Sequence, residues 1–406
     1  MGGIYRAVIG RRAVVFGRTA DLGAQGVITT TALDVSTGEL LWERKGEAPL
    51  LGAPLLLAAG PSVERVEERT GRTIWRSTPV CGGSGDPDYA ASVGGRLYVG
   101  CAGGQLAALG ISNGRLAASA KPMTLDEYDQ IVPLGDGKLW VSGMASGAFM
   151  YKQSAIVRGD TLSSVVVFQP DHRILGVRDG DVLVDDTCCG GTKSDSWPGV
   201  IQRVSLASGT TISTVNLHPY PYTIPTDSDL PGPGMVLAVG NDLYVGTHSA
   251  LFVYNLTNLD ARPRVLYGDL SGSLPVAIDN RYLLLELGPN GSQQTVLLDS
   301  YANARVIWTE AGRWGLRDQR GAVLQIFNYT TGVSSLLLAN AMPRAFPVDP
   351  TCAIQASSGS FVFVECRNLG LNSHEHIGGM PKCVTVGQSS TCPESIAVYA
   401  LPVRTQ

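Results

Sequence analysis

The chain has 406 residues, of which 44% are hydrophobic and 16% are charged, and its net charge is −4. Its 31 basic residues against 35 acidic ones leave no cationic surplus to displace counterions from phosphates, which disfavours nucleic acid as a partner. The longest apolar stretch, residues 50–59, contains Gly52 and Pro54 and is much shorter than the ~20 residues of a membrane-spanning helix. We therefore expect no transmembrane segment, and the 49 glycines and 23 prolines indicate many short strands joined by turns.

Eight cysteines indicate an oxidising compartment, because a reducing cytosol rarely lets so many thiols pair. Short separations along the chain predict local disulfides, namely Cys81–Cys101, Cys352–Cys366 and Cys383–Cys392. The other two cysteines are the adjacent Cys188 and Cys189. The sequence therefore predicts an exported protein in which most cysteines are oxidised.

Three Asn-X-Ser/Thr triplets, at Asn255, Asn290 and Asn328, match the acceptor sequence for N-linked glycans. Arginines interrupt the apolar residues near the N-terminus, so the continuous apolar segment of a signal peptide is absent from this chain. We therefore expect an extracellular or cell-surface glycoprotein whose signal peptide has been removed.

The clearest repeat lies near the start of the chain. Residues 32–42 align without a gap to residues 65–75, and both segments contain an acidic residue, then Thr-Gly, then Trp. An acidic side chain before such a turn bonds local backbone groups, and glycine accepts the positive φ of a tight hairpin. Each copy therefore predicts a strand, a tight turn and a second strand whose tryptophan packs between neighbouring sheets.

Weaker copies of the strand-and-turn pattern follow, with turns at Gly114, at Gly209, within residues 255–259, within residues 299–303 and at Gly332. The interval from 114 to 209 is about twice the others, which predicts one degenerate unit inside it. A second pattern, Leu-Tyr-Val-Gly, occurs at residues 97–100 and 243–246, and loosely at 139–143. It predicts the strand that precedes each turn.

Together these patterns describe a unit of roughly 40–45 residues with several antiparallel strands, the size of a four-stranded propeller blade. Near the C-terminus, residues 361–365 and 396–401 also read as strands, and we expect them to complete a blade with residues 13–16. The sequence therefore predicts an all-β fold, a single β-propeller domain over residues 1–406 closed by its N- and C-terminal strands. Eight four-stranded antiparallel blades are expected, with seven as the alternative.

The frame Asp-x-x-Thr-Gly-x-x-x-Trp, at Asp34 to Trp42 and in related form at Glu67 to Trp75, resembles the repeat of pyrroloquinoline-quinone-type propellers. That superfamily includes quinoprotein dehydrogenases and cofactor-free scaffolds such as an outer-membrane assembly lipoprotein. The resemblance implies the propeller fold, whereas function differs between members. We expect a non-enzymatic member.

The pair Cys188-Cys189 resembles the vicinal disulfide beside the quinone in some quinoprotein alcohol dehydrogenases. It departs from that family because it lies in the middle of the chain, where the family has its pair early. The alternatives are pairing with other cysteines, or a structural kink in a loop between blades.

Two further patterns contain metal-ligand residue types. His374 and His376, followed by Cys383 and Cys392, suit zinc, but the separated cysteines favour two exposed histidines beside a disulfide. The other histidines are isolated, so no catalytic triad is indicated: His172, His218 and His248. Carboxylate clusters at residues 126–129, 179–186 and 227–229 suit calcium, with solvated loops or a hairpin turn as the alternative. We expect no cofactor, and calcium is the one ion these clusters favour.

Long segments between strands are the expected functional surface, because loops carry specificity on a rigid scaffold. They comprise residues 81–89, 188–199, 219–234 and 368–381. Trp197, Tyr220 and Tyr222 supply aromatic faces for protein or glycan contacts, or alternatively pack the loops down. We predict an exported scaffold that binds a protein or glycan partner. The alternatives are a quinone- or metal-dependent oxidoreductase and a self-associating structural subunit of an extracellular polymer or surface layer.

Overall fold

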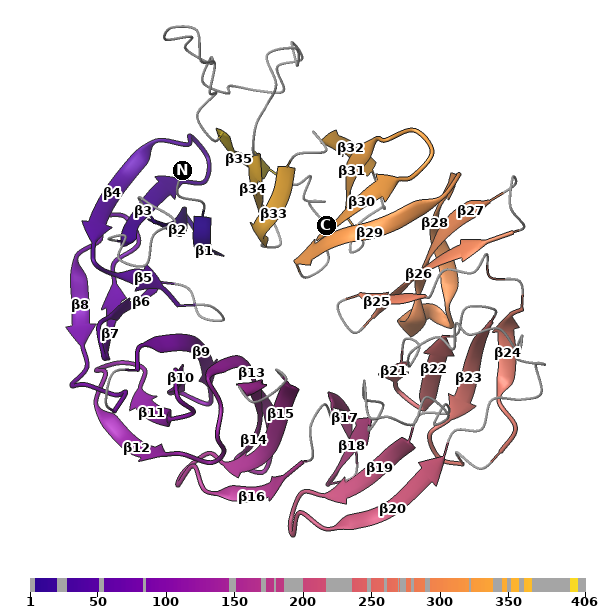
Figure 1. The fold of residues 1–406 in the computed structure, drawn as a ribbon, viewed down its shortest axis with the longest axis horizontal. Coiled ribbons are helices and arrows are strands. Elements are labelled where there is room, and N and C mark those ends of the chain that lie inside the picture. Colours follow the sequence, from indigo (N-terminus) through magenta and orange to yellow (C-terminus); the bar gives the residue numbers. More distant parts are fainter. Residues whose placement is uncertain are drawn as a thin grey trace, which may run out of the picture. The chain divides into compact units, whose positions relative to one another are not determined.

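The computed structural model describes the chain in segments, and everything below refers to them. They are residues 4–19, 28–50, 55–82, 85–145, 151–168, 173–178, 180–185, 200–216, 236–246, 250–258, 261–268, 270, 275–278, 281–288, 293–320, 323–338, 345–348, 352–357, 361–366 and 395–400. Apart from a short 3₁₀ helix at Ser300–Ala302, the regular elements of these segments are β-strands (Figure 1).

The chain forms two compact units, of which the first comprises residues 1–95, 110–116 and 314–406. Two four-stranded sheets follow one another at its N-terminal end: β1 (Ile4–Ile9), β2 (Ala13–Thr19), β3 (Ile28–Asp34), β4 (Leu40–Lys45), then β5 (Ala48–Pro49), β6 (Leu56–Ala59), β7 (Ser62–Val66), β8 (Thr73–Arg76). Its C-terminal part holds a four-stranded and a three-stranded sheet: β29 (Trp314–Arg320), β30 (Val323–Asn328), β31 (Ser334–Leu338), β32 (Ala345–Val348), then β33 (Cys352–Ser357), β34 (Phe361–Cys366), β35 (Ser395–Ala400).

The second unit comprises residues 96–109 and 117–313 and holds four sheets of four strands each. The first two are β13 (Glu127–Gly135), β14 (Lys138–Ala145), β15 (Tyr151–Arg158), β16 (Ser164–Val167), then β17 (Arg173–Arg178), β18 (Asp181–Asp185), β19 (Val200–Ser205), β20 (Thr211–Asn216). The next two are β21 (Val236–Val239), β22 (Asp242–Gly246), β23 (Leu251–Asn255), β24 (Arg264–Tyr267), then β25 (Val276–Ile278), β26 (Tyr282–Leu287), β27 (Gln294–Asp299), β28 (Arg305–Ala311).

One further four-stranded sheet consists of β9 (Pro87–Val93), β10 (Arg96–Cys101), β11 (Leu106–Gly110) and β12 (Leu116–Ala120). In every sheet the strands are neighbours in the order in which they follow along the chain. Their pairings are antiparallel wherever the register is defined, as in Tyr282↔Asp299 between β26 and β27. The predicted all-β, propeller-type fold built from four-stranded antiparallel blades is therefore confirmed.

Nine sheets are present in the described residues, where the sequence analysis expected eight blades. The difference lies at the chain ends. Residues 13–16 lie in β2, which pairs with β1 and β3, so the N-terminal sheet completes its four strands from its own end of the chain. Residues 361–365 lie in β34, which pairs instead with β33 and with residues 396–400 of β35. The number of blades, and closure of a single domain by its terminal strands, stay predictions.

Within the first unit, the N-terminal and C-terminal sheets contact each other through side chains. Phe16 of β2 and Phe363 of β34 are almost completely buried, and their rings stack with centroids 5.2 Å apart. Ala7, Val14 and Ala356 belong to the same buried cluster. The two ends of the chain are therefore joined by a shared apolar core, with no described strand pairing between them.

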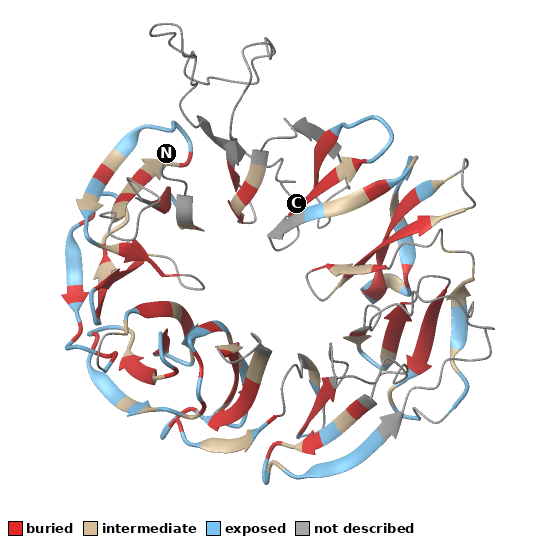
Figure 2. Ribbon diagram, in the orientation of Figure 1, coloured by how far each residue is buried: buried red, intermediate tan, exposed pale blue. Residues whose placement is uncertain are grey.

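Burial follows position within each sheet, as Figure 2 shows. The second and third strands of most sheets are largely buried, as in β6, β7, β23 and β26, whereas exposed residues are frequent on fourth strands such as β8. A sheet buried on both faces reads as continuous apolar sequence, which explains runs such as Leu283–Leu285 in β26.

Candidate functional site

Two tryptophans of the predicted repeat dock onto the following segment of the chain. Trp42 of β4 donates its Nε1–H to the carbonyl oxygen of Glu68 at 2.9 Å, and Trp75 of β8 donates to that of Ile111 at 3.1 Å. The Trp42 ring lies against Gly71, where an added Cβ would come within 2.7 Å of the ring. The predicted packing of these tryptophans between neighbouring sheets is therefore confirmed, and the glycine of the turn provides the space.

The Leu-Tyr-Val-Gly pattern forms a second docking contact, in the second unit. Tyr98 and Tyr244 are buried, and their hydroxyls donate to the carbonyl oxygens of Gly159, at 3.1 Å, and Ser300, at 3.4 Å. The glycine that ends the motif allows close packing, since a Cβ at Gly100 would lie 2.5 Å from the Tyr128 ring. Burial raises the pKa of the Tyr244 hydroxyl, consistent with a neutral hydrogen-bond donor.

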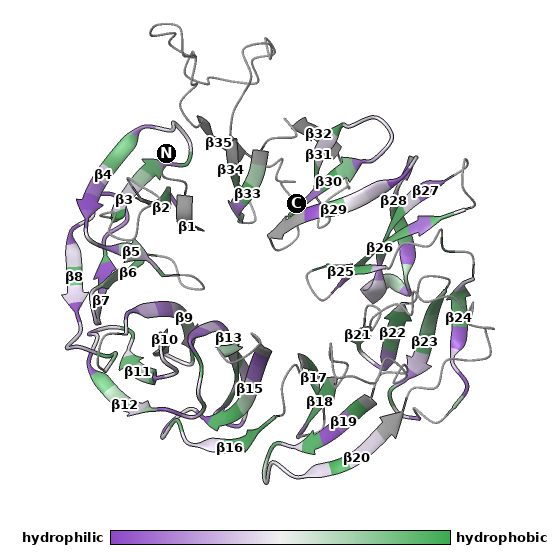
Figure 3. Ribbon diagram, in the orientation of Figure 1, coloured by the Kyte–Doolittle hydropathy of each residue, from purple (hydrophilic) through white to green (hydrophobic). Residues whose placement is uncertain are grey.

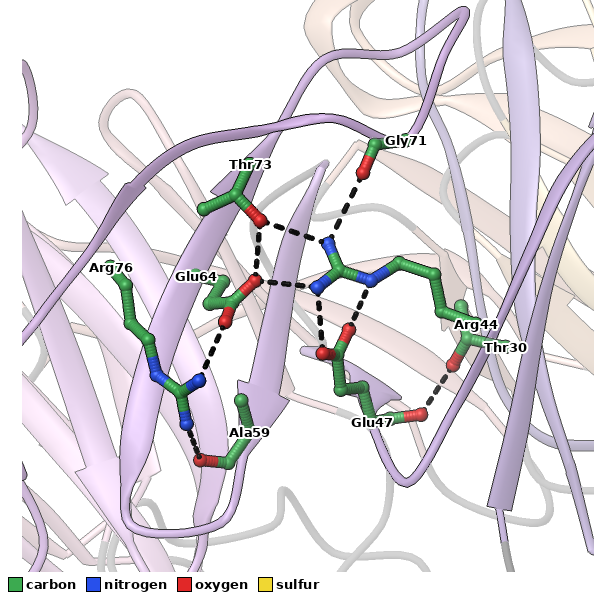
Figure 4. Close-up of polar contacts among 8 residues, drawn as sticks. All are labelled: Thr30, Arg44, Glu47, Ala59, Glu64, Gly71, Thr73 and Arg76. Carbon is green, nitrogen blue, oxygen red and sulfur yellow. Dashed lines mark hydrogen bonds and ion pairs between the residues drawn. The ribbon is translucent and has the colours of Figure 1, made fainter.

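Charged side chains join the first two sheets of the first unit (Figure 4). Arg44 of β4 contacts Glu47 through Nε at 2.7 Å and Glu64 through Nη2 at 2.8 Å. Glu64, whose side chain is only 4% exposed, also accepts from Arg76 at 3.1 Å and from the Thr73 hydroxyl at 2.9 Å. Two arginines and a hydroxyl thus compensate one buried carboxylate, the condition under which a buried charge is tolerated.

Burial raises the pKa of Glu47, and the adjacent Arg44 opposes that rise. Both carboxylates are held by guanidinium groups that come from the fold itself. We assign this cluster to the cohesion of the two sheets, because its charges are balanced internally.

Acidic side chains of the second unit are also engaged by basic ones. Asp299 makes a two-point contact with Arg281, at 3.0 Å and 2.7 Å, and this interaction lowers the pKa of the carboxyl. Asp181 pairs with Arg203 at 2.6 Å. Asp129, from the predicted calcium cluster at residues 126–129, pairs with Lys152 at 2.7 Å. Across the described segments, no group of three or more His, Cys, Asp or Glu side chains is arranged to hold a metal ion.

Of the predicted disulfides, one is present in the structure and a second is supported only by the pairing of its two strands. Cys81 and Cys101 are disulfide-bonded, as predicted. Cys352 and Cys366 are Cα partners on the neighbouring strands β33 and β34, in the position that the sequence analysis assigned to them, and their bond stays a prediction.

Many candidate residues lie outside the described segments, including the aromatic loop residues and the vicinal cysteines. They are Trp197, Tyr220, Tyr222, Cys188, Cys189, Cys383, Cys392, His172, His218, His248, His374, His376, Asp227 and Asp229. Their roles stay predictions.

Exposed apolar side chains form a feature that sequence reasoning missed. We call the last strand in chain order of a four-stranded sheet its fourth strand. Large apolar residues with 43–61% exposure lie on several of these strands: Leu40 of β4, Ile74 of β8, Leu116 of β12, Val167 of β16, Ile212 of β20, Val265 of β24 and Val306 of β28. In the sequence, these apolar residues follow the turns closely. Whether such a residue is exposed depends on whether its strand lies at the edge of the sheet, which the sequence pattern does not indicate.

Within the described segments, no helix is long and apolar enough to cross a membrane.

Comparisons with known proteins bear on the first repeats. Residues 59–127 match a family model described as outer membrane protein assembly factor BamB, whereas the comparison with curated proteins finds no match. Among solved structures, BamB from Moraxella catarrhalis is 12% identical, with a TM-score of 0.42 over 79% of this chain and 90% of that one. The computationally designed Ika8 protein is also 12% identical, with a TM-score of 0.45 over 86% of this chain and 96% of that one.

The quinohemoprotein alcohol dehydrogenase from Comamonas testosteroni is 10% identical, with a TM-score of 0.45 over 100% of this chain and 76% of that one. The resemblance predicted from the Thr-Gly-Trp frame is therefore confirmed as a similarity of residues 59–127 to a PQQ-type repeat family, the one described for the assembly factor.

Proposed function

We propose that this chain is an exported β-propeller scaffold that binds a protein partner and has no catalytic role of its own. The similarity of residues 59–127 to a family described as an outer membrane protein assembly factor carries the proposal. Apolar side chains that are exposed on the last strands of several sheets, such as Ile74 of β8 and Ile212 of β20, are of the kind that a protein partner covers.

The disulfide-bonded Cys81 and Cys101 support the proposed location outside the cytosol, because structural disulfides persist in oxidising compartments. We propose the extracellular space or the cell surface. The partner is a protein, with a glycan as the alternative, and the loops that contain Trp197, Tyr220 and Tyr222 are part of the proposed contact surface.

Crosslinking in the native source, followed by titration with the purified partner, tests the proposal. We expect saturable binding, and we expect the triple substitution of Trp197, Tyr220 and Tyr222 by alanine to weaken it by about tenfold, since buried aromatic anchors dominate such interfaces. Tyr301→Ala is the matched control, because Tyr301 is 65% exposed and belongs to none of the proposed loops.

Equal binding by the triple variant and the wild type would remove the loops from the contact surface. Alcohol-dependent dye reduction with bound quinone, lost in Cys188→Ala, would replace the scaffold by an oxidoreductase. Ordered filaments or layers of the purified chain would replace it by a structural subunit.

A further inference from the structure

Strand β20 (Thr211–Asn216) carries no charged residue, unlike the fourth strands β4, β8, β24 and β28. It lies at the end of its sheet, after β19, and the side chains of Thr211, Ile212, Ser213 and Thr214 are all exposed. Residues 204–217 contain no Asp, Glu, Lys or Arg, and residues 210–217 contain no Gly or Pro. Exposed edge strands normally carry charge or proline, because their unpaired backbone groups otherwise pair with another chain.

Most of the other fourth strands have charged residues on them or directly beside them, which disfavour pairing with another chain. Charged residues lie on β4, β8, β24 and β28, namely Glu43, Arg44, Lys45, Arg76, Arg264, Arg305 and Glu310. Strand β12 is uncharged but lies between Arg115 and Lys121. Figure 3 shows the contrast, with purple at the end of β4 and pale and green tones on β20.

Strand β16 (Ser164–Val167) is also uncharged, but the turn that precedes β20 lies against it. A Cβ at Gly209 would come within 2.8 Å of the Val165 carbonyl oxygen and within 3.0 Å of the Val166 side chain. Position 213 of β20, four residues after the turn glycine, matches Trp42 and Trp75 in the repeat, and it is a serine. The docking tryptophan of the earlier sheets is therefore replaced on β20 by a small exposed residue.

We propose that β20 is a binding edge that takes an extended, uncharged segment of the partner protein as an additional β-strand. Backbone N–H and C=O groups on the outer side of an edge strand are satisfied by another extended backbone, which defines the occupant as a β-strand. Cross-strand neighbours then set its composition. The partner residues opposite Ile212, Ser213 and Thr214 are apolar, β-branched or hydroxylated.

This inference rests on the proposed scaffold function and names the form in which the partner is bound. It is tested with purified protein and a probe, a fluorescent capped nonapeptide of alternating threonine and valine with a lysine at each end. We expect saturable binding by anisotropy, and slower hydrogen exchange of the backbone amides of residues 211–216 in the bound state. The same peptide with two central prolines lacks ladder donors, and we expect no binding from it.

Ile212→Lys adds the charge that the other edges carry, and we expect it to weaken the peptide by about tenfold, or ~1.4 kcal/mol. Ile74→Lys on β8 is the matched control, because Ile74 and Ile212 are both 53% exposed on a fourth strand. We expect the control to bind within about twofold of the wild type, and both variants to keep the wild-type melting temperature, since neither side chain is buried. Thr214→Lys provides a second, independent change on the same edge.

Four outcomes would overturn the inference: no peptide binding, equal binding of the proline peptide, equal effects of Ile212→Lys and Ile74→Lys, or a β20-dependent dimer in sedimentation, which would make a second copy the occupant. Failure of the proposed function is distinguishable, because the peptide would then bind at β20 while crosslinking in the source yields no partner. If Ile212→Lys leaves binding of the partner unchanged, the proposed binding edge at β20 is wrong, whereas the proposed scaffold function is unaffected.

Discussion

At the scale of single residues, glycine is required in the turns for two different structural reasons. Gly38 and Gly71 occupy the same place in the repeat, with φ of 73° and 66°. No atom lies within 4 Å of a Cβ built at Gly38, whereas one built at Gly71 meets the ring of Trp42 at 2.7 Å. Gly38 is therefore required by backbone conformation alone, and Gly71 is also required by packing.

We expect Gly38→Ala to lower the free energy of unfolding by about 1 kcal/mol, the cost of a left-handed non-glycine residue. Gly71→Ala pays the same cost and also displaces a buried indole, which adds about 1–3 kcal/mol. Urea denaturation of both variants measures the difference. Equal losses of unfolding free energy in the two variants would show that the Trp42 ring can move away from a Cβ at position 71 without a loss of stability.

Asp299 links a local turn to an ion pair. Its Oδ1 accepts from the backbone N–H of Tyr301 at 3.1 Å, and both of its oxygens face Arg281. The hydrogen bonds from Arg281, opposed by burial, hold the pKa of Asp299 below its ordinary value of 3.8. A carboxyl whose pKa is lowered by folding stabilises the folded state above its unfolded pKa, and that stabilisation is lost as the pH falls through the folded value.

We therefore expect the unfolding free energy to fall as the pH drops from ~5 to ~2, with a part of the fall that depends on Asp299. Asp299→Asn removes that part, so its stability changes less over this range than that of the wild type. Urea midpoints at a series of pH values provide the measurement. Parallel curves for the two proteins would contradict the assignment.

At the scale of elements, Arg44 connects strand β4 to the sheet that follows. Its guanidinium contacts Glu47, the buried Glu64 and the carbonyl oxygen of Gly71, at 3.2 Å for the last. Glu64 keeps Arg76 when Arg44 is removed, but Arg76 is 56% exposed and contacts only the other oxygen. The buried side of the Glu64 carboxylate therefore depends on Arg44 and on the hydroxyl of Thr73.

We expect Arg44→Ala to destabilise the first unit by about 3–5 kcal/mol, because it leaves buried carboxylates under-compensated. Arg72→Ala is the matched control. The N–O distance of the Arg72–Glu67 pair is 3.5 Å and its side chains are 79% and 43% exposed, so we expect its loss to leave the stability nearly unchanged. A double substitution, Arg44→Met with Glu64→Gln, should recover part of the loss; an Arg44→Ala variant as stable as Arg72→Ala would make the cluster a surface feature.

The elements show where sequence reasoning succeeds. Turns with a Thr-Gly signature, an Asp or Asn cap and a following tryptophan follow from local chemistry, and the structure has them: Asp34 Oδ1 accepts from the N–H groups of Ser36 and Thr37. The unit hidden between positions 114 and 209 is the sheet β13–β16. Its turn was not recognised because Leu162, at φ 60°, takes the place of the usual glycine.

Other features depend on contacts that the sequence does not contain. Residues 13–16 were expected to share a sheet with the C-terminal strands. The N-terminal sheet already has the four strands β1 to β4, and the C-terminal strands β33, β34 and β35 pair among themselves. The exposure of Ile212 and Leu40 depends on which strand is last in its sheet, and single-strand patterns do not encode that order. The roles of Trp197, Tyr220 and Tyr222 lie outside the described segments.

At the scale of the whole molecule, similar docking contacts and a disulfide crosslink contribute to stability in the described segments. The contacts of Trp42, Trp75, Tyr98 and Tyr244 repeat the same geometry, an aromatic donor and a backbone carbonyl acceptor. The disulfide-bonded Cys81 and Cys101 add a covalent constraint that acts mainly on the unfolded chain.

We expect the substitution of both Cys81 and Cys101 by serine to lower the unfolding free energy by about 3 kcal/mol, the chain-entropy value for a loop of roughly 20 residues. Thiol counting in denaturant, followed by peptide mapping, verifies the pairing in the wild type. Two free thiols at these positions in protein from the native source would contradict both the crosslink and the proposed export.

The indole contacts of the first unit have an optical consequence. Trp42 and Trp75 are each 8% exposed, and each donates to a carbonyl on a later segment of the chain. When such a ring leaves its glycine and enters water, its fluorescence moves to longer wavelength. In a variant that keeps Trp42 as its sole tryptophan, excited selectively at the red edge of its absorption, separation of β4 from the turn at Gly71 would therefore appear as a red shift of the emission. This signal is separate from the circular dichroism of strand melting. Trp42, which joins the two sheets, therefore also reports their separation during unfolding.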